Sequence, residues 1–378
     1  MPRPDLVVAS LLRPATLEGL GEQEWDLLIR QARRANLLGR LAHQTRGDGG
    51  FAVALPAARP HLLSATVVAE RQRTAIRWEV ECIRRALVPS GVPLVLLKGA
   101  AYVMAGLPIA QGRMFADVDI IVPKQALPQV ESALLMQGWV GNHHDAYDQR
   151  YYRQWMHEIP PMQHLRRGTV IDVHHAILPE TARVRADSRA MREAAVTVPG
   201  HDGVLVFAPT DMVLHSATHL FHEGEFDNGL RDLFDIDGLL RHFAGEREFW
   251  SQLAPRAVEL GLTRPLYYAL RHATAMLGTP VPPEVMNAVA PGGPPALTRA
   301  LTDFCFARCL RPNHQTCRDR GTPWARTLLY LRAHWLRMPM HLLAYHLVRK
   351  ALVSPKQRSD PDPAAAAADA DTQPNVPG

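Results

Sequence analysis

The sequence has few of the residues and segments that mark a secreted or membrane-spanning protein. Its 378 residues include only four cysteines, which do not suggest the disulfide framework of a small secreted domain. No apolar run reaches the roughly 20 residues that a transmembrane helix needs. The N-terminal stretch MPRPDLVVASLLRP has too short an apolar run for a signal peptide and no cleavage pattern. We therefore expect a cytoplasmic protein with no transmembrane segment.

Neither sign of charge is in large excess. The chain has 42 Lys and Arg against 37 Asp and Glu, a formal net charge of +5, and its sequence pI is near 9.2. This mild basic excess is compatible with an anionic partner such as a nucleotide, RNA or a membrane surface, but it requires none. Hydrophobic residues make up 47% and charged residues 21% of the chain, as in an ordinary globular protein.

The most informative stretch runs from Val92 to Val122. It contains two short apolar runs: the first ends at Lys98 and Gly99, and the second includes Asp117 and Asp119. This pattern predicts two buried strands that enclose a turn and a short helix. Because side chains alternate along a strand, both aspartates are expected on one face, with the intervening apolar residues facing the core.

Polar side chains in this stretch have the chemistry of a phosphate site. Two carboxylates one pleat apart repel each other unless a cation lies between them. Mg²⁺ (or Mn²⁺) suits that place, because Mg²⁺ takes hard oxygen ligands and retains room for phosphate oxygens. Lys98 and Arg113 are cations suited to phosphate, and Gly99 lets the backbone approach closely. Either fragment alone is common in exposed strands and turns, but the combination on consecutive strands is more specific.

A later strand adds a third carboxylate. The segment GTVIDVHHAI is rich in β-branched residues, and Asp172 and His174 share one face of the predicted strand. His175 faces the other way and fits a buried core histidine. An unpaired carboxylate in an apolar strand would be costly, which favours a metal-binding role for Asp172. The alternative is a local hydrogen bond at the end of the strand.

The segments LLKGAAYVMAG and GRMFADVDIIVP resemble the polymerase-beta-type nucleotidyltransferase superfamily. They are most similar to its uncharacterised bacterial nucleotidyltransferase-like subgroup and to abortive-infection toxin nucleotidyltransferases. The resemblance is specific over residues 92–123 and weaker onward to about residue 240. Most members have Gly-Ser at the turn, whereas this chain has Lys98, Gly99 and Ala100. No serine hydroxyl is therefore available there to hold a triphosphate.

The resemblance implies a metal-dependent nucleotidyltransferase. Such an enzyme moves a nucleoside monophosphate from a nucleoside triphosphate to an acceptor and releases pyrophosphate. The acceptor stays open between a protein or peptide side chain, a tRNA end and a small molecule. The implied catalytic and metal-binding residues are Asp117, Asp119 and Asp172, with Mg²⁺ or Mn²⁺ as cofactor, and the implied substrate-binding residues are Lys98, Gly99, Arg113 and His174.

Two other classes of function compete with this hypothesis. One is a non-catalytic nucleotide-binding or protein-interaction module on the same fold, although the intact Asp-x-Asp argues against it. The other is an RNA-binding or membrane-associated protein that acts through basic helices, which only the mild positive charge supports.

The expected fold class is α+β, with a small mixed nucleotidyltransferase sheet flanked by helical regions. Helical spacing predicts a helical N-terminal region at residues 1–88 and a helical C-terminal region at 210–352. The nucleotidyltransferase core occupies 89–209 and includes a hairpin insertion around residues 201–203. The acidic, Pro/Ala-rich tail at 353–378 is predicted to be disordered. The sequence does not indicate an oligomeric state.

Histidines and acids also recur at helical spacing after residue 210. His215, His219 and His222 share a helix face, but the glutamate of a zinc-protease motif is missing, so we expect them to line the cleft or cap the core. Arg231 and Asp235 are four positions apart, which predicts an ion pair within one helix.

A loose cysteine cluster lies further along the chain. Cys305, Cys309, His314 and Cys317 resemble a zinc knuckle but have the wrong spacing. Because Cys305 and Cys309 fit one helix face, we expect buried thiols instead.

Overall fold

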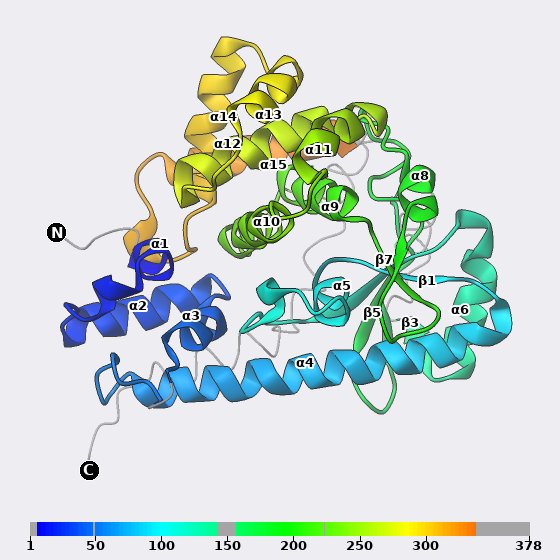
Figure 1. The fold of residues 1–378 in the computed structure, drawn as a ribbon, viewed down its shortest axis with the longest axis horizontal. Coiled ribbons are helices and arrows are strands. Elements are labelled where there is room, and N and C mark those ends of the chain that lie inside the picture. Colours follow the sequence, from blue (N-terminus) through cyan, green and yellow to red (C-terminus); the bar gives the residue numbers. More distant parts are fainter. Residues whose placement is uncertain (1–5, 48–49, 142–155, 223, 338–378) are drawn as a thin grey trace, which may run out of the picture.

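The computed structural model describes residues 6–47, 50–141, 156–222 and 224–337. The predicted tail at 353–378 and the preceding residues 338–352 lie outside these ranges. Within them the chain is an α+β protein, as predicted, in which helices surround one mixed sheet (Figure 1). In this described part no helix is long and apolar enough to cross a membrane.

The seven-stranded sheet has the order β3-β4-β5-β2-β1-β7-β6. Strand β2 lies near its centre, antiparallel to β1 and parallel to β5. The predicted hairpin around residues 201–203 is present as antiparallel β6 and β7, and β7 runs parallel to β1. The strands are β1 (Leu94–Leu96), β2 (Asp117–Ile121), β3 (Trp139–Gly141), β4 (Met162–His164), β5 (Val170–His174), β6 (Val196–Thr197) and β7 (Val204–Val206).

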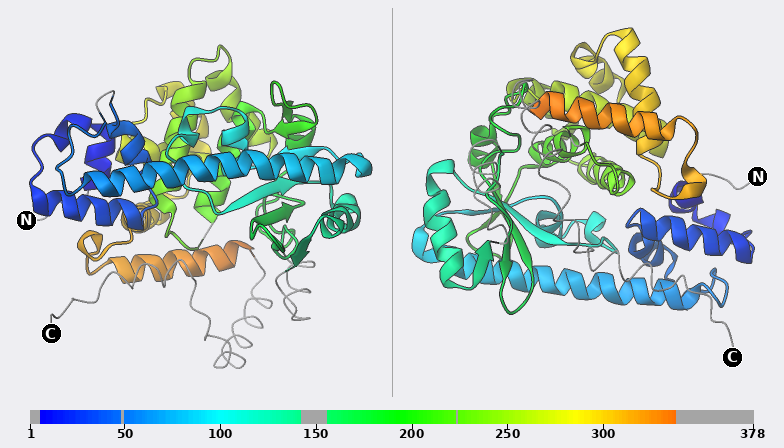
Figure 2. Two further views of the ribbon diagram at one scale, coloured as in Figure 1. Left: turned by 90° about the horizontal axis from the view of Figure 1, so that it is seen from below. Right: turned by 180° about the vertical axis from the view of Figure 1, so that it is seen from behind.

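The helices that precede the sheet in the chain, or connect its first strands, lie in the lower half of Figure 1. The long helix α4 packs against α3, α5, α6 and β2, and Figures 1 and 2 show it extending from the N-terminal helices to the sheet. Its 29 residues end where Pro89 enters a short 3-10 helix. The helices are α1 (Leu6–Leu12), α2 (Glu22–Arg34), α3 (Leu38–Thr45), α4 (Arg59–Leu87), α5 (Lys98–Met104) and α6 (Leu127–Met136).

The remaining helices follow β5 and cover the opposite side. Helix α9 packs against α10, α11 and α12, and α14 packs against α15. The α-helices are α8 (Ser188–Glu193), α9 (Pro209–His222), α10 (Gly229–Phe243), α11 (Phe249–Glu259), α12 (Thr263–Leu277), α13 (Pro283–Val289), α14 (Ala296–Cys309) and α15 (Thr322–Arg337). Short 3-10 helices lie at η1 (Pro14–Leu17), η2 (Val88–Ser90), η3 (Pro108–Ala110), η4 (Lys124–Ala126), η5 (Ala290–Gly292) and η6 (Gln315–Cys317).

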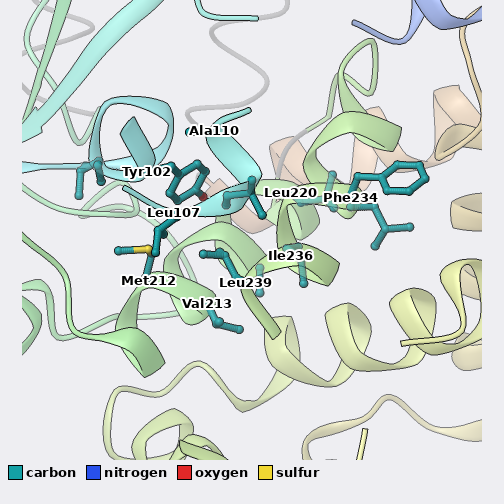
Figure 3. Packing of buried hydrophobic residues seen from close by; sticks show 14 of the residues in the cluster. Tyr102, Leu107, Ala110, Met212, Val213, Leu220, Phe234, Ile236 and Leu239 are labelled. Atoms are coloured by element: carbon teal, nitrogen blue, oxygen red, sulfur yellow. The ribbon is translucent and has the colours of Figure 1, made fainter. Parts of the chain in front are cut away.

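One hydrophobic core runs through all of these parts. Its buried cluster reaches from Leu6 in α1 to Leu329 in α15. Figure 3 shows its middle, where Tyr102 and Leu107 face side chains of α9 and α10. The fit is close, because a Cβ added at Gly238 of α10 would lie 2.0 Å from Ile109. The N-terminal and C-terminal helices thus share a core with the sheet.

The predicted buried thiols are confirmed. Cys305 and Cys309 are buried free thiols, Cys317 is buried as well, and burial raises the pKa of Cys309 to about 11. The Nδ1 atom of His314 accepts a hydrogen bond from the backbone N–H of Thr316.

Candidate active site

Three carboxylates meet on one face of the central sheet. In the parallel register of β2 and β5, Asp119 lies directly opposite Asp172, and Asp117 lies opposite Val170. Because partners in a parallel pair point to the same side, and residues two apart share a face, all three aspartates project together. The other face of β2 presents Val118, which is buried in the core as predicted.

Lys98 supplies the nearest positive charge. It opens α5 directly after β1, and its Nζ lies 3.1 Å from Asp119 Oδ1. Its φ of 44° is in the left-handed region, which a residue with a Cβ adopts at a cost of roughly 1–2 kcal/mol. The turn therefore holds Lys98 in a strained conformation that directs its ammonium toward the carboxylates.

His174 connects two carboxylates on the same face. Its Nε2 lies 3.0 Å from Asp119 Oδ1, and its Nδ1 lies 3.2 Å from Glu158 Oε2. Although burial alone would lower it, the hydrogen bond with Asp119 and the charge of Glu158 raise the pKa of His174. Glu158 was not singled out in the sequence. It reaches the site because residue 158 forms an isolated antiparallel bridge with His174.

The nearby cations compensate the charge of Asp119 but not fully those of Asp117 and Asp172. Although burial opposes it, Lys98 and the hydrogen bond with His174 hold the pKa of Asp119 well below its usual range. The charge of Asp119 and burial raise the pKa of Asp117. Burial, Asp119 and Asp117 raise the pKa of Asp172 to about 7.

Asp172 also has an unsatisfied polar atom. Its Oδ1 is buried and has no hydrogen-bond partner among the described residues. A buried carboxylate oxygen without a partner is costly and calls for an explanation such as an ion. Three carboxylates with an excess of negative charge are also the oxygen donors that Mg²⁺ prefers. The donor set and its orphaned oxygen therefore fit a divalent hard cation.

Arg113 and Gly99 lie against other residues of the protein. Arg113 Nε donates to Asp235 Oδ2 at 2.8 Å, and the guanidinium lies 5.2 Å from the Phe115 ring centre. A Cβ added at Gly99 would lie 2.6 Å from Arg113 Nη1 and 2.8 Å from Phe115 Cδ1. The missing side chain of Gly99 thus makes room for Arg113.

Asp235 anchors Arg113 from α10. The same carboxylate accepts from Arg40 Nη2 at 2.8 Å through its Oδ1, so it bridges two arginines distant in sequence. The predicted ion pair between Arg231 and Asp235 is wrong, because Arg231 pairs with Asp232. Asp235 faces the core, where a buried carboxylate requires cationic partners, and Arg40 and Arg113 reach it there.

Helix α9 places two histidines, His215 and His219, near Lys98. Burial and the charge of Lys98 lower the pKa of His215 to about 3, and they lower that of His219 well below its usual value. His215 packs edge-on against Phe207, with ring centres 5.6 Å apart. His222 is buried beside Arg332, which with burial lowers its pKa to about 3. These rings are neutral, and among the described residues they are not part of a metal-ligand cluster of three or more groups.

Comparison with known proteins identifies one family. A family model described as an uncharacterised nucleotidyltransferase matches residues 21–278, which is well over half of the chain. The match begins before α2 and ends after α12, so it includes the N-terminal helices together with the sheet. No curated protein and no solved structure matches the chain.

Proposed function

The chain belongs to this uncharacterised nucleotidyltransferase family, and from that premise we propose that it is a metal-dependent enzyme. It moves a nucleoside monophosphate from a nucleoside triphosphate to an acceptor and releases pyrophosphate. The observation that carries the proposal is that Asp117, Asp119 and Asp172 share one sheet face, where Asp172 Oδ1 has no hydrogen-bond partner among the described residues.

Asp117, Asp119 and Asp172 are the residues that would hold the metal ion. When bound, Mg²⁺ (or Mn²⁺) supplies neutralisation of triphosphate charge and polarisation of the phosphoryl oxygens. The second oxygen of Asp119 is the one directed away from Lys98 and His174, since both contact Oδ1. Lys98 and His174 therefore fix the orientation of Asp119.

A substrate contact is proposed for Lys98, whereas His174, whose two ring nitrogens lie beside Asp119 and Glu158, is proposed to position Asp119. Lys98 carries a compact ammonium with three donors, and among the described residues it donates one hydrogen bond, to Asp119, which leaves donors for phosphate oxygens. Asp172 is also proposed to take the proton of an attacking hydroxyl, because a carboxyl group whose pKa is raised to about 7 can accept a proton there. A general base in hydrogen-bond reach of that hydroxyl makes its oxygen a better nucleophile.

Arg113 and Gly99 are proposed to act by positioning. Asp235 already neutralises the Arg113 guanidinium, and Arg113 fills the space beside Gly99 at the start of α5. This packing holds the turn in which Lys98 keeps its left-handed backbone. Of the two cations expected to bind phosphate, Lys98 is therefore proposed to contact it, and Arg113 is proposed to support Lys98.

The test is nucleotide transfer by purified full-length protein. Each α-labelled nucleoside triphosphate is supplied with Mg²⁺ or Mn²⁺ and cell lysate, and transferred label and pyrophosphate are measured. Wild type should transfer label, and the double variant Asp117→Ala/Asp119→Ala should not. Asp202→Ala, which removes an exposed carboxylate in the hairpin turn, is the matched control and should transfer normally.

Separation of the labelled products identifies the acceptor class as protein or peptide, tRNA end or small molecule. Nucleotide binding without pyrophosphate release for any nucleotide would contradict the proposal and favour a non-catalytic module. RNA binding with a steep salt dependence that the aspartate changes leave intact would favour the RNA-binding alternative.

A further inference from the structure

A second group of metal-ligating side chains lies next to the three aspartates. His157, Glu158 and His174 each offer a ligand atom, and these atoms all lie within 4.8 Å of one another. In the part of the chain that the structure describes, no other group of three or more such residues meets this criterion. The group contains two imidazoles and one carboxylate, a different donor set from the three carboxylates of β2 and β5.

The backbone holds these ligands in place without an ion. Glu158 and His174 face each other in an antiparallel bridge. Ile159 N–H donates to Val173 O at 3.0 Å, and His175 N–H donates to His157 O at 2.8 Å. The segment that carries His157 and Glu158 is therefore fixed to the end of β5. Preorganised ligands reduce the conformational entropy that metal binding must overcome.

The two ring nitrogens of His174 each face a carboxylate oxygen, Nε2 that of Asp119 and Nδ1 that of Glu158. When Nε2 donates to Asp119 Oδ1, Nδ1 presents a lone pair to Glu158 Oε2 at a distance of 3.2 Å. Two acceptors at that distance repel unless a proton or a metal ion lies between them. A histidine that binds a metal through one nitrogen and donates the other N–H to a carboxylate is the usual arrangement in metalloproteins.

His157 supplies an independent observation. Its Nδ1 is buried and has no hydrogen-bond partner in the part of the chain that the structure describes, and its ring stacks on that of His174 with centres 5.3 Å apart. A buried ring nitrogen without a partner is costly, and coordination of an ion would satisfy it.

We propose that His157, Glu158 and His174 form a binding site for a divalent ion of the Zn²⁺ class, separate from the three-aspartate site. Two imidazole nitrogens and one carboxylate are a zinc donor set that leaves a fourth position open, whereas carboxylates alone suit Mg²⁺. Through His174, an ion at this site fixes the tautomer that donates to Asp119. The zinc site thereby orients one of the proposed catalytic carboxylates.

The experiment measures zinc retention by the full-length chain. Protein stripped with a chelator is dialysed against Zn²⁺ in an excess of Mg²⁺, which saturates hard oxygen sites, and bound zinc is determined by elemental analysis. Wild type should retain a single equivalent. His157→Ala and the isosteric Glu158→Gln should each weaken zinc binding at least ~10-fold. His201→Ala, which removes an exposed histidine in a turn, should bind zinc normally.

Other outcomes would overturn the inference. Absence of zinc in wild type would mean that a proton bridges His174 and Glu158. Loss of zinc in Asp117→Asn together with normal zinc binding in His157→Ala would place the ion at the aspartates. After Co²⁺ substitution, a thiolate charge-transfer band would place the ion on cysteines. Nucleotide transfer is assayed separately, so zinc retention without transfer supports this site while contradicting the proposed function.

Discussion

Gly99 illustrates how one missing side chain can position another. We predict that Gly99→Ala destabilises the protein by about 1–3 kcal/mol, because its Cβ would lie 2.6 Å from Arg113 Nη1 and overpack the turn. The free energy of unfolding is measured by denaturant titration. Gly19→Ala is the control, since a Cβ there meets nothing within 4 Å. Equal stability of the two variants would show that Gly99 does not depend on Arg113 packing.

Asp172 should show opposite effects on function and stability. We predict that Asp172→Asn lowers transfer on the order of 100-fold or more, because the general base and a metal-binding carboxylate are lost. Its thermal midpoint should stay equal or rise, since a buried charge beside Asp117 and Asp119 is removed. Transfer and thermal unfolding are measured on the same preparation. Near-normal transfer would remove Asp172 from the catalytic set.

Asp235 is a buried carboxylate shared by two arginines, so its substitution is expected to be costly. Asp235→Ala leaves Arg113 and Arg40 without their shared carboxylate, and breaking such a buried pair costs about 3–5 kcal/mol. The matched control is Asp26→Ala, which breaks an exposed pair with Arg30 and should cost at most about 1 kcal/mol. Denaturant titration of both variants gives the comparison. A loss in Asp235→Ala no larger than in the control would contradict the anchoring role.

At the scale of elements, helices α9 and α12 carry buried neutral histidines. Burial, which outweighs the nearby carboxylate of Asp303, lowers the pKa of His272 in α12 to about 4. Because the folded pKa lies below the unfolded value of about 6.5, the unfolded chain binds more protons between them. The stability from keeping His272 neutral is therefore full above pH 6.5 and is lost as pH falls toward 4.

We predict that His272→Leu flattens this acid dependence. Between pH 7.5 and 5, the wild type should lose about 2 kcal/mol more than the variant, from the linkage of the two pKa values. Unfolding free energies at a series of pH values provide the measurement. His201→Leu is the control, because an exposed side chain meets similar solvent in both states. Parallel pH curves for wild type and His272→Leu would contradict the assignment.

On the scale of the whole molecule, one hydrophobic core includes residues of the N-terminal helices, the sheet and the C-terminal helices. The buried cluster joins α1, the sheet and α15, and Asn36 and Gln31 of the N-terminal region bond to Asn228 and Thr316. We predict that a fragment of residues 89–209 does not fold by itself, because its apolar faces lose the helices that cover them. Its thermal unfolding is followed by circular dichroism beside the full chain. A sharp transition of the fragment would show that this core is independent.

The sequence alone determined the local structure of the central stretch. Period-two alternation placed Asp117 and Asp119 on one face of a strand, and the same period placed Asp172 beside His174. These predictions succeeded because side-chain direction in a strand depends only on neighbouring residues. The α+β class, the helical region before the sheet and the family resemblance were readable for the same local reason.

Only the tertiary structure decided which distant residues meet. The parallel register of β2 and β5 set Asp119 opposite Asp172, and a single bridge brought Glu158 to His174. The tertiary structure also pairs Asp235 with Arg40 and Arg113 instead of with Arg231, its predicted partner in the helix. Such pairings depend on where elements dock, since burial makes a charge select the partner that the core offers. No local pattern contains that information.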